Sequence, residues 1–159
     1  MDTFDAQALG EAFCSFPPTS QEWFASRDVF LGLSKPHGYG LRALPEKFGM
    51  LERELERSYC GRNYVACVLL AVAMIETLDA LLTKEIRERL RDELDYAMIR
   101  GELAWLQMLR NNIAHANPNR NPNPIPSDEY IFNKPALEEH ARHASAIAFR
   151  FAFGYTRFA

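Results

Sequence analysis

The chain has 159 residues, of which 48% are hydrophobic, 25% charged and 12% aromatic. This composition is that of one globular domain with a sizeable core, and it excludes disordered and low-complexity classes. The formal net charge of −3 excludes a uniformly basic surface, so a polyanionic partner would have to bind at a local cluster.

The N-terminal region predicts two helices. Residues 2–13 carry apolar side chains at helical spacing and predict a short amphipathic helix. Thr19 and Glu22 occupy the first and last positions of a capping box, which opens a second helix that runs to about Leu33. Residues 35–40 contain one proline and two glycines, and they predict a loop.

Two further helices follow before the middle of the chain. Pro45 suits the first turn of a helix that runs to about Cys60, and Gly61 ends it. Its apolar stripe consists of Phe48, Leu51, Leu55 and Tyr59. Asn63 then begins the most hydrophobic helix of the chain, over residues 64–82, which is apolar nearly all round and therefore predicts a buried position.

Residues 84–114 predict two helices separated by a glycine. Residues 84–100 are rich in charge and carry one apolar stripe, as in a helix with a solvated face. Gly101 predicts a break before a helix over residues 102–114.

An Asn- and Pro-rich stretch, residues 117–127, cannot form a helix or a strand and predicts a long loop. After it, Asn133 caps a last helix that runs to about Gly154. No segment alternates with a period of two residues. The sequence therefore predicts an all-α bundle of about five to seven helices.

Cysteine usage and hydropathy indicate a cytoplasmic protein without a membrane segment. Cys14, Cys60 and Cys67 show no paired spacing, and seven residues of helix would separate the last two by roughly 10 Å, too far for a disulfide. We expect reduced, buried thiols. The most apolar run, residues 65–75, is too short to cross a bilayer, and the acidic N-terminus does not resemble a signal peptide.

The end of the helix over residues 102–114 gathers residues that can do chemistry. At about 100° per residue, its core stripe consists of Leu103, Leu106, Leu109 and Ile113. Arg110 lies at the edge of this stripe, whereas Asn111 and His115 share the opposite side. Residues four apart on a helix are within reach of each other, so one helix end offers a guanidinium, an amide and an imidazole.

The segment Arg110-Asn111-Asn112-Ile113-Ala114-His115 resembles the Arg-polar-x-x-x-His signature of the HEPN superfamily (higher eukaryotes and prokaryotes nucleotide-binding domains). The preceding helix, from Asn63 through Glu76, resembles the family's long apolar helix that bears an acidic residue. The resemblance covers roughly residues 45–153. It implies a HEPN-like bundle over residues 45–159, with residues 1–44 as an N-terminal helical extension.

The resemblance also implies a function. Many members of the family are metal-independent endoribonucleases of toxin–antitoxin, abortive-infection and CRISPR systems, and their sites typically form across a two-fold dimer. For this chain it implies an RNA substrate and a homodimer with a shared cleft. It also implies an antitoxin or regulatory protein as a further partner, and neither a metal nor a cofactor. The products would be a 2′,3′-cyclic phosphate and a 5′-hydroxyl.

The residue types suit this reaction, in which the 2′-hydroxyl of RNA is the nucleophile. His115 can exchange protons near neutral pH, because the ordinary pKa of histidine is near 6.5. The donor fork of Arg110 matches phosphate oxygens and would stabilise the charge that develops on them. Asn111 would orient the phosphate or His115.

Structural interpretations of the same residues remain open. Arg110 would also be explained as an ion-pair partner of Glu76, because a charge at the edge of a buried stripe needs a partner. His115 would also be explained as a C-terminal helix cap. His140 and His143 are weaker RNA-binding candidates. They would belong either to a basic strip on the last helix or to a solvated helix face. The other members of the strip would be Arg142, Arg150 and Arg157. Arg120 lies alone in the Asn/Pro loop.

Two functions from different classes therefore remain. One is a ribonuclease that acts as a toxin or defence effector. The other is a non-catalytic module that binds a nucleotide or a partner protein in the same cleft. A metal-dependent hydrolase that uses Glu76 and Asp79 has less support, because no histidine joins them at helical spacing.

Overall fold

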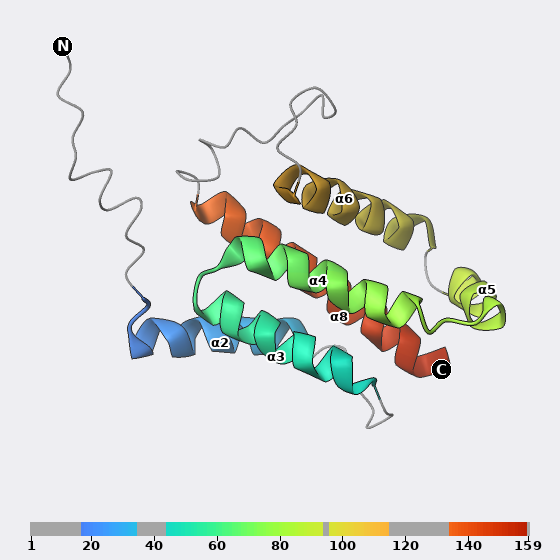
Figure 1. Ribbon diagram of the computed structural model, residues 1–159, viewed down its shortest axis with the longest axis horizontal. Coiled ribbons are helices and arrows are strands. Elements are labelled where there is room, and N and C mark those ends of the chain that lie inside the picture. The colour runs from blue at the N-terminus through green and yellow to red at the C-terminus, as the bar shows by residue number, and fades with distance from the viewer. Residues whose placement is uncertain (1–16, 35–43, 94–95, 115–133, 159) are drawn as a thin grey trace, which may run out of the picture.

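The computed structural model describes residues 17–34, 44–93, 96–114 and 134–158, and this part of the chain is helical without any strand (Figure 1). Its helices are α2 (Ser20–Ser34), α3 (Glu46–Cys60), α4 (Tyr64–Asp79), α5 (Lys84–Glu93), α6 (Tyr96–Ala114) and α8 (Lys134–Phe158). The predicted all-α bundle is confirmed.

Helices α4 and α8 lie side by side at the centre of the bundle and make its most extensive interface (Figure 1). Helices α2 and α3 cover one side of this pair, and α6 packs on α4 and α8 from another side. Helix α5 lies near the end where α8 finishes and contacts both α6 and α8. The bundle thus places α6 alongside the two central helices.

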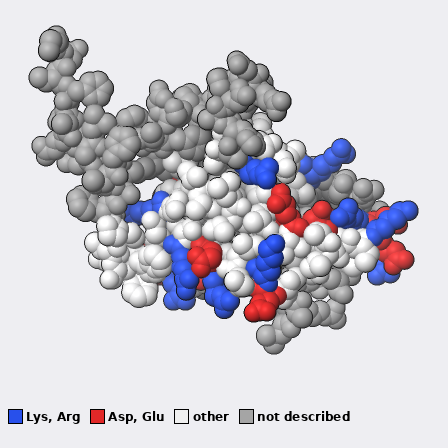
Figure 2. Space-filling model, in the orientation of Figure 1, with Lys and Arg blue, Asp and Glu red and all other residues white. Residues whose placement is uncertain are grey.

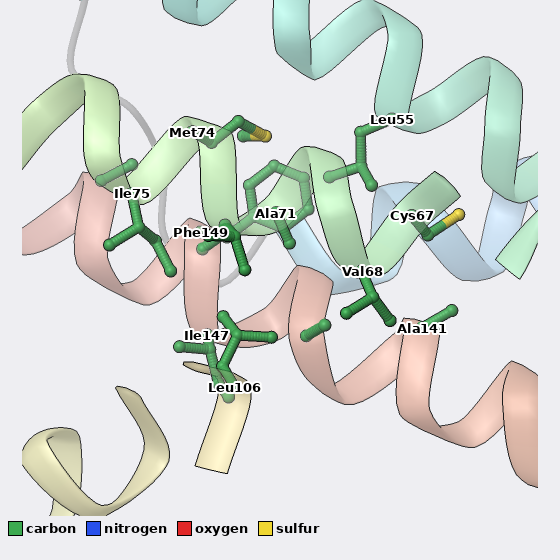
Figure 3. Close-up of a cluster of buried hydrophobic side chains, with 14 of the residues drawn as sticks. Leu55, Cys67, Val68, Ala71, Met74, Ile75, Leu106, Ala141, Ile147 and Phe149 are labelled. Carbon is green, nitrogen blue, oxygen red and sulfur yellow. The ribbon is translucent and has the colours of Figure 1, made fainter. Parts of the chain in front are cut away.

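The core is built where the apolar helix α4 meets α8 (Figure 3). Helix α8 contributes a stripe of fully buried small side chains, namely Ala141, Ala144, Ala148 and Ala152. Small residues at the contact let two helices approach closely, since the distance between helix axes depends on the side chains there. On α4, buried side chains point toward α3, α6 and α8 in turn, which explains why this helix is apolar nearly all round.

The predicted helix caps at Thr19 and Asn63 are confirmed by their hydrogen bonds. The Thr19 amide donates to Glu22 Oε2 at 2.8 Å, and the Glu22 amide donates to Thr19 Oγ1 at 3.3 Å. These contacts, with a side-chain hydrogen bond from Arg62, lower the pKa of Glu22. At the start of α4, Asn63 Oδ1 accepts a hydrogen bond from the Ala66 amide at 3.3 Å.

Four predicted boundaries are wrong. The apolar helix predicted over residues 64–82 ends at Asp79. Gly101 does not break a helix, because α6 runs through it from Tyr96; the cost of an exposed helical glycine, about 1 kcal/mol, is small beside the burial of apolar neighbours on the same helix. The predicted helix over residues 84–100 is divided between α5 and α6. The last helix continues past Gly154, since Tyr155 also packs against the core.

The remaining predictions have different outcomes. The helix over residues 2–13 and the loops over 35–40 and 117–127 lie outside the described residues. Cys60 and Cys67 are buried free thiols, and burial raises the pKa of Cys67 to about 12. Within the described ranges, no helix has the length and apolar character needed to cross a membrane.

Candidate functional site

The last turns of α6 carry Arg110 and Asn111, whose side chains contact each other directly. Arg110 Nη1 donates to Asn111 Oδ1 at 3.1 Å. Arg110 is half-buried and Asn111 is exposed, as the angular position of each on the helix predicts. Leu106 and Leu109 are each 2% exposed, so they fix this helix on the core. The guanidinium and the amide are therefore held together at a surface that a rigid helix supports.

The other half of the predicted constellation lies beyond the described residues. Ala114 is the last residue of α6, and both His115 and Arg120 fall in the undescribed range 115–133. Sequence still places His115 directly after the helix. Its relation to Arg110 and Asn111 stays a prediction.

Glu76 does not pair with Arg110. The structure describes both residues, and no ion pair among the described residues contains either of them. Glu76 is exposed and lines a pocket of about 230 Å³ together with Asp79, Gln107 and apolar side chains of α4, α6 and α8. Gln107 is one turn before Arg110 on α6, so Glu76 faces the middle of this helix rather than its end.

Glu76 and Asp79 are not joined by further metal-ligating side chains. Among the described residues, no group of three or more His, Cys, Asp or Glu side chains is close enough to hold a metal ion. The pocket at Glu76 has a mixed polar and apolar lining from α4, α6 and α8.

The predicted basic strip on α8 is largely neutralised by carboxylates. Arg150 Nη2 lies 2.9 Å from Glu102 Oε1, and this ion pair joins α8 to α6. Arg142 Nη2 donates to Glu138 Oε1 at 3.2 Å. The side chain of Arg157 is not described. Arg150 thus acts mainly within the fold, whereas Arg142 is an exposed arginine that pairs with a carboxylate of its own helix.

His140 and His143 lie together with a residue that sequence reasoning did not single out, Trp105 of α6. The Trp105 ring centroid is 4.7 Å from that of His143, with an interplanar angle of 75°, and 5.8 Å from that of His140, with an angle of 66°. His140 Nδ1 is buried and has no hydrogen-bond partner in the described part of the chain. The three rings form an aromatic cluster between α6 and α8.

This aromatic cluster opens into a hollow of about 680 Å³ at the protein surface. Its lining consists of Leu33, Trp105, Glu139, His140, Arg142, His143 and Ala146. We call it the Trp105 pocket. One signal for it was present in the sequence: His140 and His143 are three apart on a helix and therefore share a face. That α6 would present Trp105 to this face depends on helix packing, which the sequence pattern does not specify.

Comparisons with known proteins identify no relative of this chain. No family model, no curated protein and no solved structure matches this chain. The class that the fold defines is an all-α helical bundle, and the functional argument rests on the residues themselves.

Proposed function

We propose that this protein is a metal-independent endoribonuclease of the HEPN type, in which Arg110, Asn111 and His115 form the active site. The observation that carries the proposal is the contact between Arg110 and Asn111 at the end of α6. That contact holds a half-buried guanidinium and an exposed amide near the helix end. In the sequence His115 follows Asn111 by four residues, about one helical turn.

The roles follow from the chemistry of each group. Arg110 stabilises the extra charge on the phosphoryl oxygens in the transition state, because its planar donor fork fits two of those oxygens. Asn111 holds the guanidinium through the 3.1 Å hydrogen bond and so reduces the entropy lost on substrate binding. His115 takes the proton of the 2′-hydroxyl. RNA supplies its own nucleophile, so the reaction has no need of a metal-bound water.

The charge distribution supports a local binding site rather than a broad basic surface. Figure 2 shows Lys and Arg side chains interspersed with Asp and Glu over this face of the molecule, with a mostly uncharged centre. A homodimer that brings two copies of Arg110 to one cleft would double the local positive charge, and this arrangement is part of the proposal.

Cleavage of RNA in the presence of EDTA tests the proposal. We expect the purified protein to produce 2′,3′-cyclic phosphate ends, and we expect Arg110→Ala and His115→Ala to reduce the rate at least about 100-fold. Arg100→Ala is the matched control, since Arg100 is an exposed arginine of the same helix and should cleave like the parent. If the parent cleaves no RNA and its expression in bacteria is no more toxic than that of the two variants, the proposal is wrong.

A second candidate function has one observation in its favour. Val65 and Leu69 are 36% and 40% exposed and lie one turn apart on α4. Exposed apolar side chains of this size are typical of protein-binding surfaces when they are adjacent. A non-catalytic module that binds a partner protein would therefore use this part of the bundle. Growth unaffected by expression, together with no cleavage by the purified protein, would favour it.

A further inference from the structure

We propose that the Trp105 pocket binds an unpaired nucleobase. This inference deepens the proposed function and rests on it, because an RNA substrate is the expected source of that base. The alternative source of the same chemistry is a free nucleotide. The pocket is separate from the Arg110–Asn111 contact, so the two can be tested independently.

The aromatic geometry of the pocket suits a flat ligand. The rings of Trp105 and His143 meet nearly at right angles, with their centroids 4.7 Å apart. A planar ring can therefore stack on one of them while its edge meets the face of the other. Stacking on aromatic side chains is the usual way in which single-stranded RNA presents its bases to protein. His143 is exposed and Trp105 is half-buried, so the cluster has aromatic surface open to a ligand.

The charge of the pocket favours a base over a phosphate. Its lining holds one guanidinium, Arg142, and one carboxylate, Glu139, and Arg142 already donates to Glu138. The charges of Arg142 and Glu139 offset each other, and the nearby carboxylate makes this a poor environment for a phosphate group. A neutral base with donors and acceptors along its edge can instead pair with both Arg142 and Glu139. Leu33 and Ala146 add apolar surface beneath it.

The pocket lies within reach of the proposed cleavage site. Trp105 and Asn111 are six residues apart on α6, which corresponds to about 9 Å along the helix axis. Met108 lies between them, both along the helix and around it, and is 52% exposed. Arg110 itself lies about 160° around α6 from Met108, but its guanidinium reaches Asn111 Oδ1. An RNA strand that crosses α6 at Met108 can therefore place a phosphate at the Arg110–Asn111 contact and a neighbouring base in the Trp105 pocket.

Trp105 fluorescence provides the test. The chain contains two tryptophans, so a Trp23→Phe background leaves Trp105 as the single reporter. The probe is a single-stranded oligonucleotide of about ten nucleotides with 2′-O-methyl groups, which lacks the attacking hydroxyl and stays intact. We expect saturable quenching, and we expect His143→Ala and Trp105→Leu to weaken binding about 5-fold or more. For Trp105→Leu, which removes the reporter, binding is measured with a fluorescent label on the oligonucleotide.

Two probes separate base recognition from phosphate recognition. An abasic oligonucleotide of the same length should bind at least about 5-fold more weakly, whereas a nucleoside and its 5′-monophosphate should bind about equally. If the protein binds the oligonucleotide much more tightly than the nucleoside, the natural ligand of the pocket is a base of RNA. If the two affinities are equal, the natural ligand is a free nucleotide. The inference is overturned if the abasic probe binds as tightly as the intact one, or if His143→Ala binds like the control Arg53→Ala, an exposed arginine of α3.

The outcomes for the two proposals are distinguishable. Cleavage that is lost in Arg110→Ala, without any base-dependent quenching at Trp105, would overturn the pocket and leave the ribonuclease. Base-dependent quenching in a protein that cleaves no RNA would retain the pocket and overturn the ribonuclease.

Discussion

The guanidinium of Arg150 and the carboxylate of Glu102 form a 2.9 Å ion pair that joins α8 to α6, and the two side chains are only 30% and 16% exposed. The second carboxylate oxygen of Glu102 is buried and has no hydrogen-bond partner in the described part of the chain. Because α6 carries both Arg110 and Trp105, this pair is one of the contacts that hold the candidate site on the bundle.

We expect Arg150→Met to lower the free energy of unfolding by about 2 kcal/mol, measured by urea denaturation. The substitution leaves the shielded carboxylate of Glu102 without its counter-ion, which costs more than the pair itself contributes. Partial exposure of Arg150 keeps the expected loss below that of a fully buried pair. Glu102→Gln in the same chain should recover part of the loss, since it removes the unpaired charge.

The control for this prediction is the exposed pair of Arg87 and Asp79, whose side chains are 49% and 54% exposed. Arg87→Met should change the free energy of unfolding by less than about 1 kcal/mol, because water and salt screen such pairs. Equal losses at Arg150 and Arg87 would contradict the structural role of the buried pair.

Two phenylalanines of α2 provide a second prediction, about how this helix is attached. Phe30 is 2% exposed, and its ring centroid lies 5.7 Å from that of Tyr59 and 5.4 Å from that of Phe149. We expect Phe30→Ala to cost about 3 to 5 kcal/mol, as other large-to-small changes in cores do. Phe24→Ala, at a side chain that is 59% exposed, should cost less than about 1 kcal/mol. Similar losses at both positions would mean that α2 is not anchored through Phe30.

The sequence predicts the helices well because their signals are local. Thr19 and Glu22 cap a helix through contacts three residues apart, and Asn63 does the same for α4. The break predicted at Gly101 is wrong because packing elsewhere on α6 outweighs this local signal. Its local cost is about 1 kcal/mol, and the burial of Leu106 and Leu109 on the same helix outweighs it.

The candidate site is less predictable, since its parts meet through packing between helices. Helical spacing correctly places Arg110 at the edge of the stripe and Asn111 on the exposed side. It does not give the offset between α4 and α6, which sets Glu76 opposite Gln107 and away from Arg110. Nor does it reveal that Trp105 meets two histidines of another helix.

Glu52 provides a prediction about pH. Burial, followed by the charge of Glu56, raises the pKa of Glu52 above its usual 4.5 in the folded protein. Folding therefore disfavours the ionised form, and the penalty is full above the raised folded pKa and absent below the unfolded one. We expect Glu52→Gln to increase the free energy of unfolding at pH 7 and to lose this advantage as the pH falls toward 4. Parallel urea titrations of both proteins over this range measure the effect.

Glu54→Gln is the control, because Glu54 is an exposed carboxylate of the same helix. It should change the stability at pH 7 by less than about 0.5 kcal/mol. A Glu52→Gln variant that is less stable than the parent at pH 7 would show that this carboxylate contributes to folding in its ionised form.

The last prediction concerns whether Arg110 is needed for folding or for activity. Arg110 bonds to Asn111 and has no ion pair with Glu76, so its removal does not leave a buried charge behind. We expect Arg110→Ala to change the free energy of unfolding by less than about 1 kcal/mol while it abolishes cleavage. Arg110→Lys should also stay folded and cleave poorly, because an ammonium cannot bind two phosphate oxygens in the manner of a planar fork. Glu76→Ala should leave both stability and cleavage close to those of the parent. A loss of several kcal/mol in both Arg110→Ala and Glu76→Ala would instead indicate that the two residues stabilise each other, and the proposed catalytic role of Arg110 would lose its main support.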